Sequence, residues 1–319
     1  IPPFSYLLSF LGLKLLGAER LSHVSDFSFN RGLGLFAGLN VLPKCTAMST
    51  YSYSLDEAHI RRFQEEFVKR CNKLRLYDES VINLDFHTVP HYGETSVLET
   101  HWAGAKHRRL KGALTMFAQD ASSKLILYND VDLLRSEADD AILDFVAFYK
   151  KIRRTLPGTL IFDSKFTSYP NLAKLDAMGC KFITLRRRGA KLLDHADAIK
   201  EWKRIHVPHA KRKFPNPFVY DERVTLRNFP QPIRQVIMKG TGREKPSFLI
   251  SNDYDQPVEC LVGDYARRWR VENGIAEAVK FFHLNALSSP ILVKVHFDVM
   301  LTVLADTLYY LLAQHLRGF

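Results

Sequence analysis

The sequence predicts an α/β protein in which a mixed β-sheet is flanked by helices and preceded by a helical region. Three observations support this prediction. The chain up to residue 78 is patterned for helices, strand-like runs begin after residue 80, and strand–helix alternation follows them. Strands in succession that give way to strand–helix alternation are typical of a mixed sheet covered by helices.

The N-terminal region contains two predicted short helices, residues 33–42 and 44–53, around a tight turn at 40–43. Residues 54–57 resemble a helix start, and a helix-favouring run follows at 59–74. The pair of short helices is consistent with a DNA-reading helix-turn-helix, but many helical hairpins have the same pattern. Both interpretations stay open.

The middle of the chain alternates between strand-like and helix-like runs, and a segment rich in proline and in β-like runs follows. The strand-like runs are residues 81–87, 113–119, 124–129, 159–162 and 181–185, and the helix-like stretches are residues 139–154 and 169–178. Residues 189–255 contain six prolines and three further β-like runs, at 218–226, 233–238 and 247–251. We interpret this segment as a β-rich insertion in the α/β domain.

The C-terminal part begins with a strongly helical stretch, residues 257–279. The chain therefore divides into four predicted segments: a helical region at 1–78, the first part of the α/β domain at 79–188, the β-rich insertion at 189–255, and the second part of the α/β domain at 256–319.

Composition narrows the class of protein without deciding it. The 319 residues are 46% hydrophobic, which is enough to bury a sizeable core. Lys and Arg outnumber Asp and Glu by 45 to 34, so the formal net charge is +11. This surplus suits a polyanionic partner, most commonly nucleic acid, although a merely basic protein explains the charge equally well.

Cysteine usage and the apolar segments indicate a cytoplasmic protein. The four cysteines are scattered without a C-x-x-C pair, so we expect reduced core thiols. Residues 293–312 are apolar but contain four ionisable side chains, which favours a buried helix over a membrane span. The chain starts at Ile1, and we expect the natural protein to begin earlier.

Two aspartates stand in strand-like runs that are otherwise largely apolar. Asp85 lies within residues 81–87, and Asp163 ends the run 160–163. A carboxylate at the end of a buried strand is costly unless its charge is compensated, and ligands of open α/β sheets bind beyond these strand ends. If the two strands are neighbours, the carboxylates converge, and a divalent cation would relieve their repulsion. Each aspartate alone is also consistent with a structural role, Asp163 as a helix cap.

The helical stretch near the C-terminus presents a third acidic residue. Tyr265, Arg268 and Glu272 are spaced by three and four residues, so they share one helix face. We expect an apolar stripe beside this face to pack on the sheet, formed by Val262, Ala266, Trp269 and Ala276. Glu272 would then lie at the margin of the core, although it is also consistent with a surface ion pair to Arg268.

The pattern Tyr-x-x-Arg-x-x-x-Glu at Tyr265, Arg268 and Glu272 resembles the signature helix of bacterial insertion-sequence DDE transposases. Asp85 and Asp163 precede it in the family's order, and the β-rich insertion lies between the second aspartate and the glutamate. The resemblance covers roughly residue 80 to the C-terminus. It implies a ribonuclease H-like fold that brings Asp85, Asp163 and Glu272 together as the catalytic and metal-binding residues.

The resemblance also implies the chemistry. The expected activity is metal-dependent cleavage of transposon-end DNA followed by strand transfer into target DNA, with Mg²⁺ as the cofactor, Mn²⁺ as a substitute, and two ions as the expected number. The expected partners are DNA and, in the active complex, a second copy of the chain. The expected location is the bacterial cytoplasm, in association with the nucleoid.

One position departs from the family pattern. The family usually places a lysine seven residues after the glutamate, and this position is Val279 in the present chain. Lys280 comes one residue later, which rotates it by about 100° around the helix. This departure leaves the role of Lys280 open and the acidic residues unaffected.

Several basic residues are candidates for contacting DNA. In addition to Tyr265, Arg268 and Lys280, we single out Lys106, Arg108 and Arg109, which have Trp102 nearby. The runs 186–188 and 211–213 are similar. Runs of charge are usually solvated faces, so each run alone is inconclusive.

Two other functions remain open. A ribonuclease H-like nuclease or resolvase would hydrolyse DNA without joining it, and a catalytically inactive, transposase-derived protein would only bind DNA. The intact acidic set argues against the inactive protein, and the joining reaction distinguishes the transposase from the nuclease.

Overall fold

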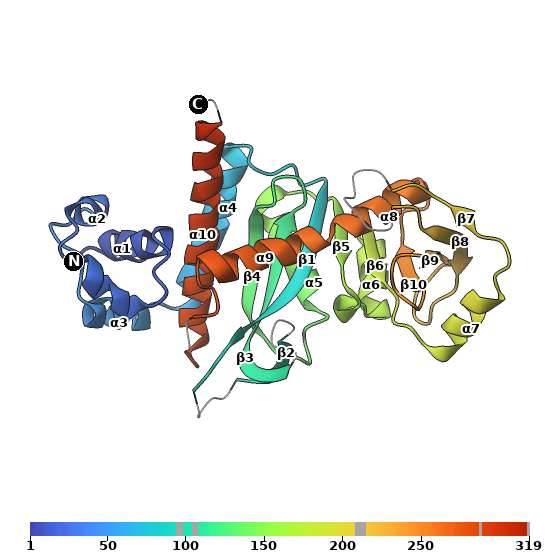
Figure 1. Ribbon diagram of the computed structural model, residues 1–319, viewed down its shortest axis with the longest axis horizontal. Coiled ribbons are helices and arrows are strands. Elements are labelled where there is room, and N and C mark those ends of the chain that lie inside the picture. Colours follow the sequence, from blue (N-terminus) through green and yellow to red (C-terminus); the bar gives the residue numbers. More distant parts are fainter. Residues whose placement is uncertain (94–97, 104–107, 208–214, 287–288, 318–319) are drawn as a thin grey trace.

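The computed structural model describes residues 1–93, 98–103, 108–207, 215–286 and 289–317. Figure 1 shows an elongated arrangement, with the N-terminal helices at one end, a large sheet in the middle and the β-rich segment at the other end. The long C-terminal helix stands between the N-terminal helices and the sheet.

The N-terminal region is helical, as the sequence predicts. Its elements are α1 (Pro3–Leu15), η1 (Leu21–Phe27), α2 (Arg31–Phe36), α3 (Cys45–Tyr53) and α4 (Glu57–Lys73). Leu13, Val24, Ala37 and Met48 form a small separate core between the first four elements. The fourth helix begins at the predicted start, where Asp56 accepts a hydrogen bond from the His59 backbone N–H at 2.8 Å.

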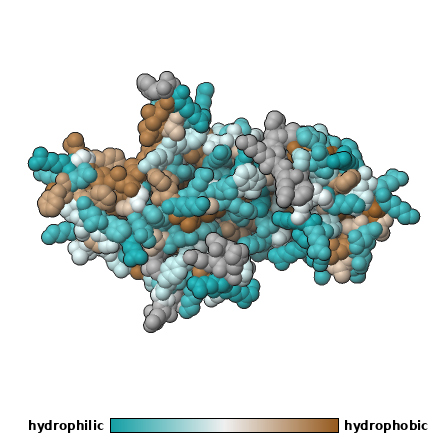
Figure 2. All heavy atoms as spheres, viewed as in Figure 1, coloured by the Kyte–Doolittle hydropathy of each residue, from teal (hydrophilic) through white to brown (hydrophobic). Residues whose placement is uncertain are grey.

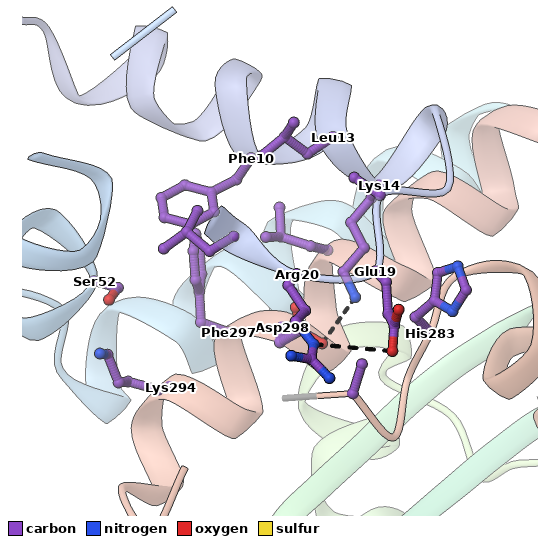
Figure 3. A pocket seen from close by; sticks show the side chains of 14 residues that line it. Phe10, Leu13, Lys14, Glu19, Arg20, Ser52, His283, Lys294, Phe297 and Asp298 are labelled. Atoms are coloured by element: carbon purple, nitrogen blue, oxygen red, sulfur yellow. Dashed lines mark hydrogen bonds and ion pairs between the residues drawn. The ribbon is translucent and has the colours of Figure 1, made fainter. Parts of the chain in front are cut away.

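A buried lysine joins this region to the rest of the protein. Lys14 of α1 lies in a pocket against the C-terminal helix, where its Nζ is 2.8 Å from the Asp298 carboxylate and donates to the Phe282 carbonyl at 2.9 Å (Figure 3). A paired ammonium this deeply buried fixes the position of α1, because separating the two charges would leave both poorly solvated.

The surface of the N-terminal region is unusually apolar. Figure 2 shows hydrophobic residues gathered over these helices and along the free end of the C-terminal helix, whereas the face over the sheet is mostly hydrophilic. The exposed large side chains there include Phe4, Phe29, Leu35 and Val41. Contiguous exposed apolar surface of this kind often marks a contact with another protein.

The central sheet combines antiparallel and parallel strands. Five of its strands are β1 (Val81–Pro90), β3 (Arg108–Asp120), β4 (Ile126–Leu133), β5 (Thr159–Phe162) and β6 (Phe182–Leu185). The spatial order of these strands is β4-β3-β1-β5-β6, in which β1, β3 and β4 are antiparallel and β1, β5 and β6 are parallel. This order confirms the expected ribonuclease H-like mixed sheet. The short strand β2 (Thr100–Ala103) pairs with the start of β3.

Helices cover both faces of the sheet, and the alternation of side chains along β1 decides which residues meet them. On one face, Ile82 and Leu84 pack in a core with α5 (Ala141–Arg153) and α6 (Tyr169–Ala177). On the other face lie α8 (Val258–Arg267), α9 (Trp269–Phe281) and α10 (Leu292–Leu316). Asp85 alternates with Leu84 and therefore projects toward the second face.

The β-rich segment continues the same sheet. It contains α7 (Ala190–Ala198), β7 (Lys203–Arg204), β8 (Phe218–Val224), β9 (Ile233–Lys239) and β10 (Ser247–Ser251). The last of these strands pairs antiparallel with β6, and β9, β8 and β7 follow outward from it. The three β-like runs of the sequence therefore form strands that extend the central sheet.

The predicted helix at 257–279 is divided at Arg268, and this corrects the expected apolar stripe. Val262 and Ala266 are buried as expected. Trp269 and Ala276 are exposed, and Val271, Ile275 and Ala278 are buried in their place. The reason is that the two halves pack against different cores: α8 packs beside β6 and β10, and α9 packs beside β1 and α10. The buried positions therefore do not form one stripe.

The long helix α10 is a core helix by its contacts. Its length and composition would allow it to cross a membrane, but 56% of its most apolar 18-residue window is buried inside the protein, and it packs against β4, α1 and α4. The cysteines only partly match the expectation. All four are free thiols, but Cys260 is exposed and Cys45 is only partly buried.

Candidate active site

The sheet places Asp85 and Asp163 side by side. In the parallel pair β1–β5 the last matched positions are Leu84 and Phe162, and each aspartate is the next residue in its chain. Adjacent strands lie about 4.8 Å apart. The nearby Ile161, two residues before Asp163, packs in the core under α8, so Asp163 alternates toward the same face as Asp85.

The pairing between β1 and β5 ends just before these two aspartates. β5 ends at Phe162, whereas β1 continues to Pro90 along its other neighbour, β3. Asp163 Oδ1 accepts a hydrogen bond from the Ser164 backbone N–H at 2.6 Å and so caps the short helix η3 (Ser164–Phe166). The capping role considered from the sequence is therefore present, and it holds this carboxylate at the open edge of β1.

Arg268 connects Glu272 to Asp85. Its Nη2 donates to Glu272 Oε1 at 2.6 Å, and its Nη1 lies 3.9 Å from Asp85 Oδ1. The Arg268 and Asp85 side chains are only 14% and 15% exposed, whereas Glu272 is 50% exposed. The guanidinium also lies 5.8 Å from the centre of the Tyr265 ring. Tyr265, Arg268 and Glu272 thus gather at one place, beside Asp85.

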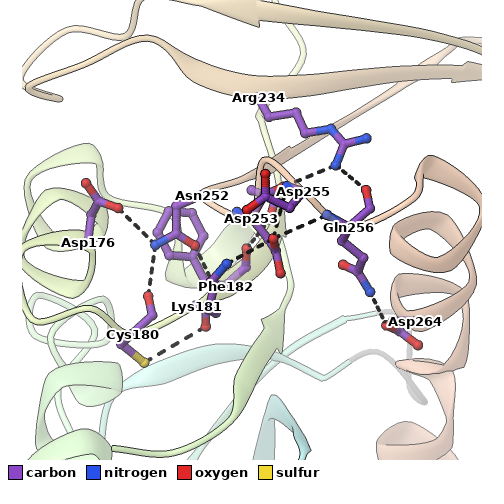
Figure 4. Close-up of polar contacts among 11 residues, drawn as sticks. Asp176, Cys180, Lys181, Phe182, Arg234, Asn252, Asp253, Asp255, Gln256 and Asp264 are labelled. Atoms are coloured by element: carbon purple, nitrogen blue, oxygen red, sulfur yellow. Dashed lines mark hydrogen bonds and ion pairs between the residues drawn. The ribbon is translucent and has the colours of Figure 1, made fainter.

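The turn before α8 is held by a polar network, which positions this helix (Figure 4). Asn252 accepts from the Phe182 backbone N–H at 2.9 Å and donates to the Cys180 carbonyl at 3.0 Å. Arg234 donates to the Asp253 carbonyl at 3.1 Å, and Gln256 donates to Asp264 at 2.7 Å. The β6 and β9 strands therefore fix the start of the helix that carries Tyr265.

Burial and neighbouring charges shift the pKa values of Asp85, Tyr265 and Arg268. Burial, reinforced by the nearby Glu272, raises the pKa of Asp85 to about 6, although the Arg268 charge opposes this shift. Burial likewise raises the pKa of Tyr265 to about 12. Burial alone would lower the pKa of Arg268, but Tyr265, Asp85 and Glu272 together raise it above its ordinary value. Perturbed pKa values of this kind concentrate at functional sites.

The donor chemistry of the three carboxylates fits a hard divalent cation, which prefers oxygen ligands. Within the described residues, however, no three His, Cys, Asp or Glu side chains are grouped closely enough to hold a metal ion. The positive charge beside Asp85 and Glu272 is instead the Arg268 guanidinium, whose Nε and Nη1 have no hydrogen-bond partner in the part of the chain that the structure describes. Arg268 therefore supplies a positive charge next to both Asp85 and Glu272.

The predicted DNA-contacting residues lie on several elements, and of those that the structure describes only Tyr265 and Arg268 lie beside Asp85. Arg108 and Arg109 are exposed at the start of β3, and Lys280 is exposed near the end of α9. Tyr265 is only partly exposed, and Arg268 points to the carboxylates. Lys106 lies outside the described residues, as does the run 211–213.

Two cations near the site were not singled out from the sequence. Lys165 follows Asp163 by two residues, and its charge acts on Asp85. Arg135 lies just after β4 and lines a cavity together with Lys165. Neither belongs to a run of basic residues, so no local pattern indicated them.

Comparisons with known proteins bear on this arrangement. The sequence model of the family described as "Transposase DDE domain" matches residues 76–308. No curated protein matches the chain. Among solved structures, "Mos1 transposase paired-end complex with left transposon end" is similar at 10% sequence identity and a TM-score of 0.22. This similarity covers 51% of this chain and 57% of that chain, so it spans little more than half of that protein.

Proposed function

Because the chain belongs to the transposase DDE domain family, we propose that it is a DNA transposase, which cuts transposon ends and joins them to target DNA. The observation that carries this proposal is the position of Asp85 and Asp163, each of which directly follows the last matched residue of two neighbouring parallel strands. Glu272 is linked to Asp85 through Arg268. Carboxylates that gather where the pairing of two parallel strands ends suit charge-demanding chemistry on phosphates.

The proposed cofactor is Mg²⁺, with Mn²⁺ as a substitute and two ions as the proposed number. DDE transposases generally use divalent metal ions. Held by Asp85, Asp163 and Glu272, two such ions would activate the attacking water or DNA 3′-hydroxyl and stabilise the leaving oxygen.

The protein's own residues then have positioning roles. Asp163 keeps its place through its bond to the Ser164 backbone, and Asp85 is held by the sheet. Arg268 places one positive charge against Glu272 and Asp85 in the free protein and so offsets part of their negative charge. In a DNA complex, Arg268 would turn toward a phosphate, and Asp85 and Glu272 would then be available to hold the metal. No side-chain nucleophile is required, because catalysis consists of positioning and charge neutralisation.

The proposed partner is DNA, both transposon ends and target. The net charge of +11 favours this partner. Exposed Arg108, Arg109 and Lys280 are the proposed contacts to the DNA backbone, together with Tyr265 and Lys106. We also propose that two copies of the chain associate in the active complex, and the exposed apolar surface of the N-terminal helices is the proposed contact. The proposed location is the bacterial cytoplasm, at the nucleoid.

The joining reaction tests the proposal. The purified protein is incubated with Mg²⁺, a labelled duplex carrying the end of its element, and a supercoiled target plasmid. Label transferred to the plasmid supports transposition. Cleavage of the duplex without transfer would instead indicate a nuclease or resolvase, and retention of the duplex without cleavage would indicate a protein that only binds DNA.

A further inference from the structure

A groove lies between α9, α10 and the turn that joins β3 to β4. Its volume is about 720 Å³, which is enough for a small-molecule ligand. Figure 1 shows α9 running across the sheet toward α10, and the α9 part of the wall extends from Trp269 to Ala278. None of the three acidic residues of the candidate active site is among the described residues that line the groove, so it is a separate site.

Two carboxylates lie close together in this groove without a counter-charge. Asp306 of α10 and Glu277 of α9 both line it. In the part of the chain that the structure describes, neither side chain has a hydrogen bond or an ion pair. Burial, reinforced by the Glu277 charge, raises the pKa of Asp306 to about 6. A cation bound in the groove would relieve this unfavourable burial of negative charge.

The cations of the wall do not neutralise this pair. The described cations of the lining are Lys124 and Arg270, and both lie toward the turn between β3 and β4. Arg270 donates from Nη1 to the Ala121 carbonyl at 3.3 Å, and Lys124 is exposed. Neither forms a salt bridge with a described carboxylate of the groove. The counter-charge for Asp306 must therefore come from outside.

A buried acceptor oxygen without a donor is a second, independent feature of the groove. Gln119 of β3 lines it and is 1% exposed. Its Nε2 donates to the Lys124 carbonyl at 2.7 Å, but its Oε1 has no hydrogen-bond partner among the described residues. The amide lies against Gly274 of α9, where an added Cβ would come within 2.6 Å of Nε2. An unsatisfied buried acceptor is unfavourable, so the groove suits a ligand that brings N–H donors.

Aromatic rings complete the wall. Trp269 is 52% exposed, and Tyr309 is 37% exposed. The Tyr309 ring is held in place, because its hydroxyl donates to the Leu15 carbonyl at 2.6 Å and Phe281 packs edge-on at 5.2 Å between ring centres. Exposed aromatic faces attract organic cations. A hard metal ion needs several oxygen ligands instead, and no three His, Cys, Asp or Glu side chains within the described ranges are grouped to hold one.

We propose that this groove binds a linear polyamine, whose ammonium groups reach Asp306, Glu277 and the Gln119 carbonyl oxygen and whose methylene chain lies on the exposed rings. A peptide suits the groove less well, because it would bring backbone N–H and C=O groups, whereas the backbone groups of α9 and α10 are bonded within each helix. The site goes beyond the proposed transposase chemistry. Because α9 forms one wall, a bound polyamine would stabilise the helix that carries Glu272.

Titration of the purified protein with spermidine in a calorimeter tests this assignment. The titration is run at pH 8, where Asp306 is ionised, and in excess Mg²⁺, which screens non-specific binding to surface carboxylates. Asp306→Asn should weaken binding by about 10-fold or more, the effect of losing a charge-assisted hydrogen bond. Glu66→Gln is the matched control, because Glu66 is 63% exposed on α4. Equal losses in the two variants, or no binding of spermidine in Mg²⁺, would overturn the inference.

A second pair of variants tests the aromatic wall. Trp269→Ala should weaken spermidine binding by about 3- to 30-fold, the range for one cation–π contact, and Trp269→Phe should restore part of the affinity. Trp102→Ala should have no effect, because Trp102 is 54% exposed but lies outside the groove. An unchanged affinity of Trp269→Ala would show that spermidine binds elsewhere, and the inference would fail.

Two competitors identify the class of ligand. Ammonium chloride at the same total charge should not displace spermidine, and displacement would mean that the groove recognises charge alone, which contradicts the inference. A tri-arginine peptide should bind more weakly than spermidine. If it binds more tightly, the groove receives a protein segment and the assignment to a free polyamine is wrong. None of these measurements uses DNA, so their outcome is independent of whether the protein transfers strands.

Discussion

Arg268 donates a hydrogen bond to Glu272 at 2.6 Å, one helical turn away, and turns its other nitrogen toward Asp85 at 3.9 Å. A single guanidinium thus lies against two carboxylates that are proposed to bind metal. An ion pair at the four-residue spacing on a helix surface is usually weak. In this site the Arg268 side chain is only 14% exposed, although Glu272 is 50% exposed, so we expect the interaction to contribute more to stability than a surface pair does.

The first prediction concerns this charge. Arg268→Ala should lower the free energy of unfolding at pH 8 in EDTA by about 2–4 kcal/mol, because it leaves Asp85 buried without a counter-charge. Addition of Mg²⁺ or Mn²⁺ should recover much of this loss in the variant and have a smaller effect on the wild type. Urea denaturation with and without metal measures both effects. Arg268→Lys keeps the charge and should fall in between, so a loss as large as that of alanine would point to packing rather than charge.

The same residue gives a second prediction, about DNA. If Arg268 turns to a phosphate when DNA binds, Arg268→Ala should weaken binding of element-end duplex and reduce the slope of log affinity against log salt by about 1. Anisotropy titrations at several salt concentrations measure the slope. An unchanged slope would mean that Arg268 remains with the carboxylates in the complex.

The third prediction is a pH dependence. The pKa of Asp85 is raised from 3.8 to about 6 in the folded protein, so its contribution to stability is fully present below pH 4 and is lost as pH rises through 6. This difference corresponds to about 3 kcal/mol. Asp85→Asn mimics the protonated form and should be more stable than the wild type above pH 7 in EDTA, with the advantage vanishing near pH 4. Denaturation curves across this pH range provide the measurement, and a difference that stays constant with pH would contradict ionisation of Asp85 as its cause.

The fourth prediction identifies the reacting site. Asp85→Asn, Asp163→Asn and Glu272→Gln should each lower DNA cleavage by about 10²-fold or more while largely sparing DNA binding. The amide variants keep an acceptor oxygen, so Asp163→Asn can still cap η3 and Glu272→Gln can still accept from Arg268. Glu66→Gln is the control, because this carboxylate is 63% exposed on α4. An active Asp163→Asn protein would remove the proposed acidic set.

Local pattern predicted the strands well, and for a physical reason. Short apolar runs bounded by turns form buried strands, and the runs at 159–162 and 247–251 became β5 and β10 with the same bounds. The two aspartates stood out because a carboxylate in such a run is rare. The two aspartates are brought together by the pairing of β1 with β5, and the local sequence pattern does not indicate which strands pair.

The features that were missed depend on tertiary structure. Trp269 and Ala276 continue an apolar helical period, but α8 and α9 meet different cores, so both side chains are exposed. The position of Arg268 between two carboxylates likewise depends on how α8 docks. The groove between α9 and α10 draws Gln119 and Asp306 from parts of the chain that are 187 residues apart, so no window of sequence contains it.

The last prediction concerns the position where the family pattern would place a lysine. Val279 is partly buried and packs against the core between α9 and α10. Val279→Lys should therefore lower the free energy of unfolding by about 1–3 kcal/mol, because the ammonium must leave water or displace its neighbours. Ala276→Lys is the matched control, since Ala276 is exposed on the same helix and should tolerate the charge. Urea denaturation of both variants gives the comparison. If Val279→Lys is as stable as Ala276→Lys and tightens DNA binding, position 279 faces DNA and does not belong to the core.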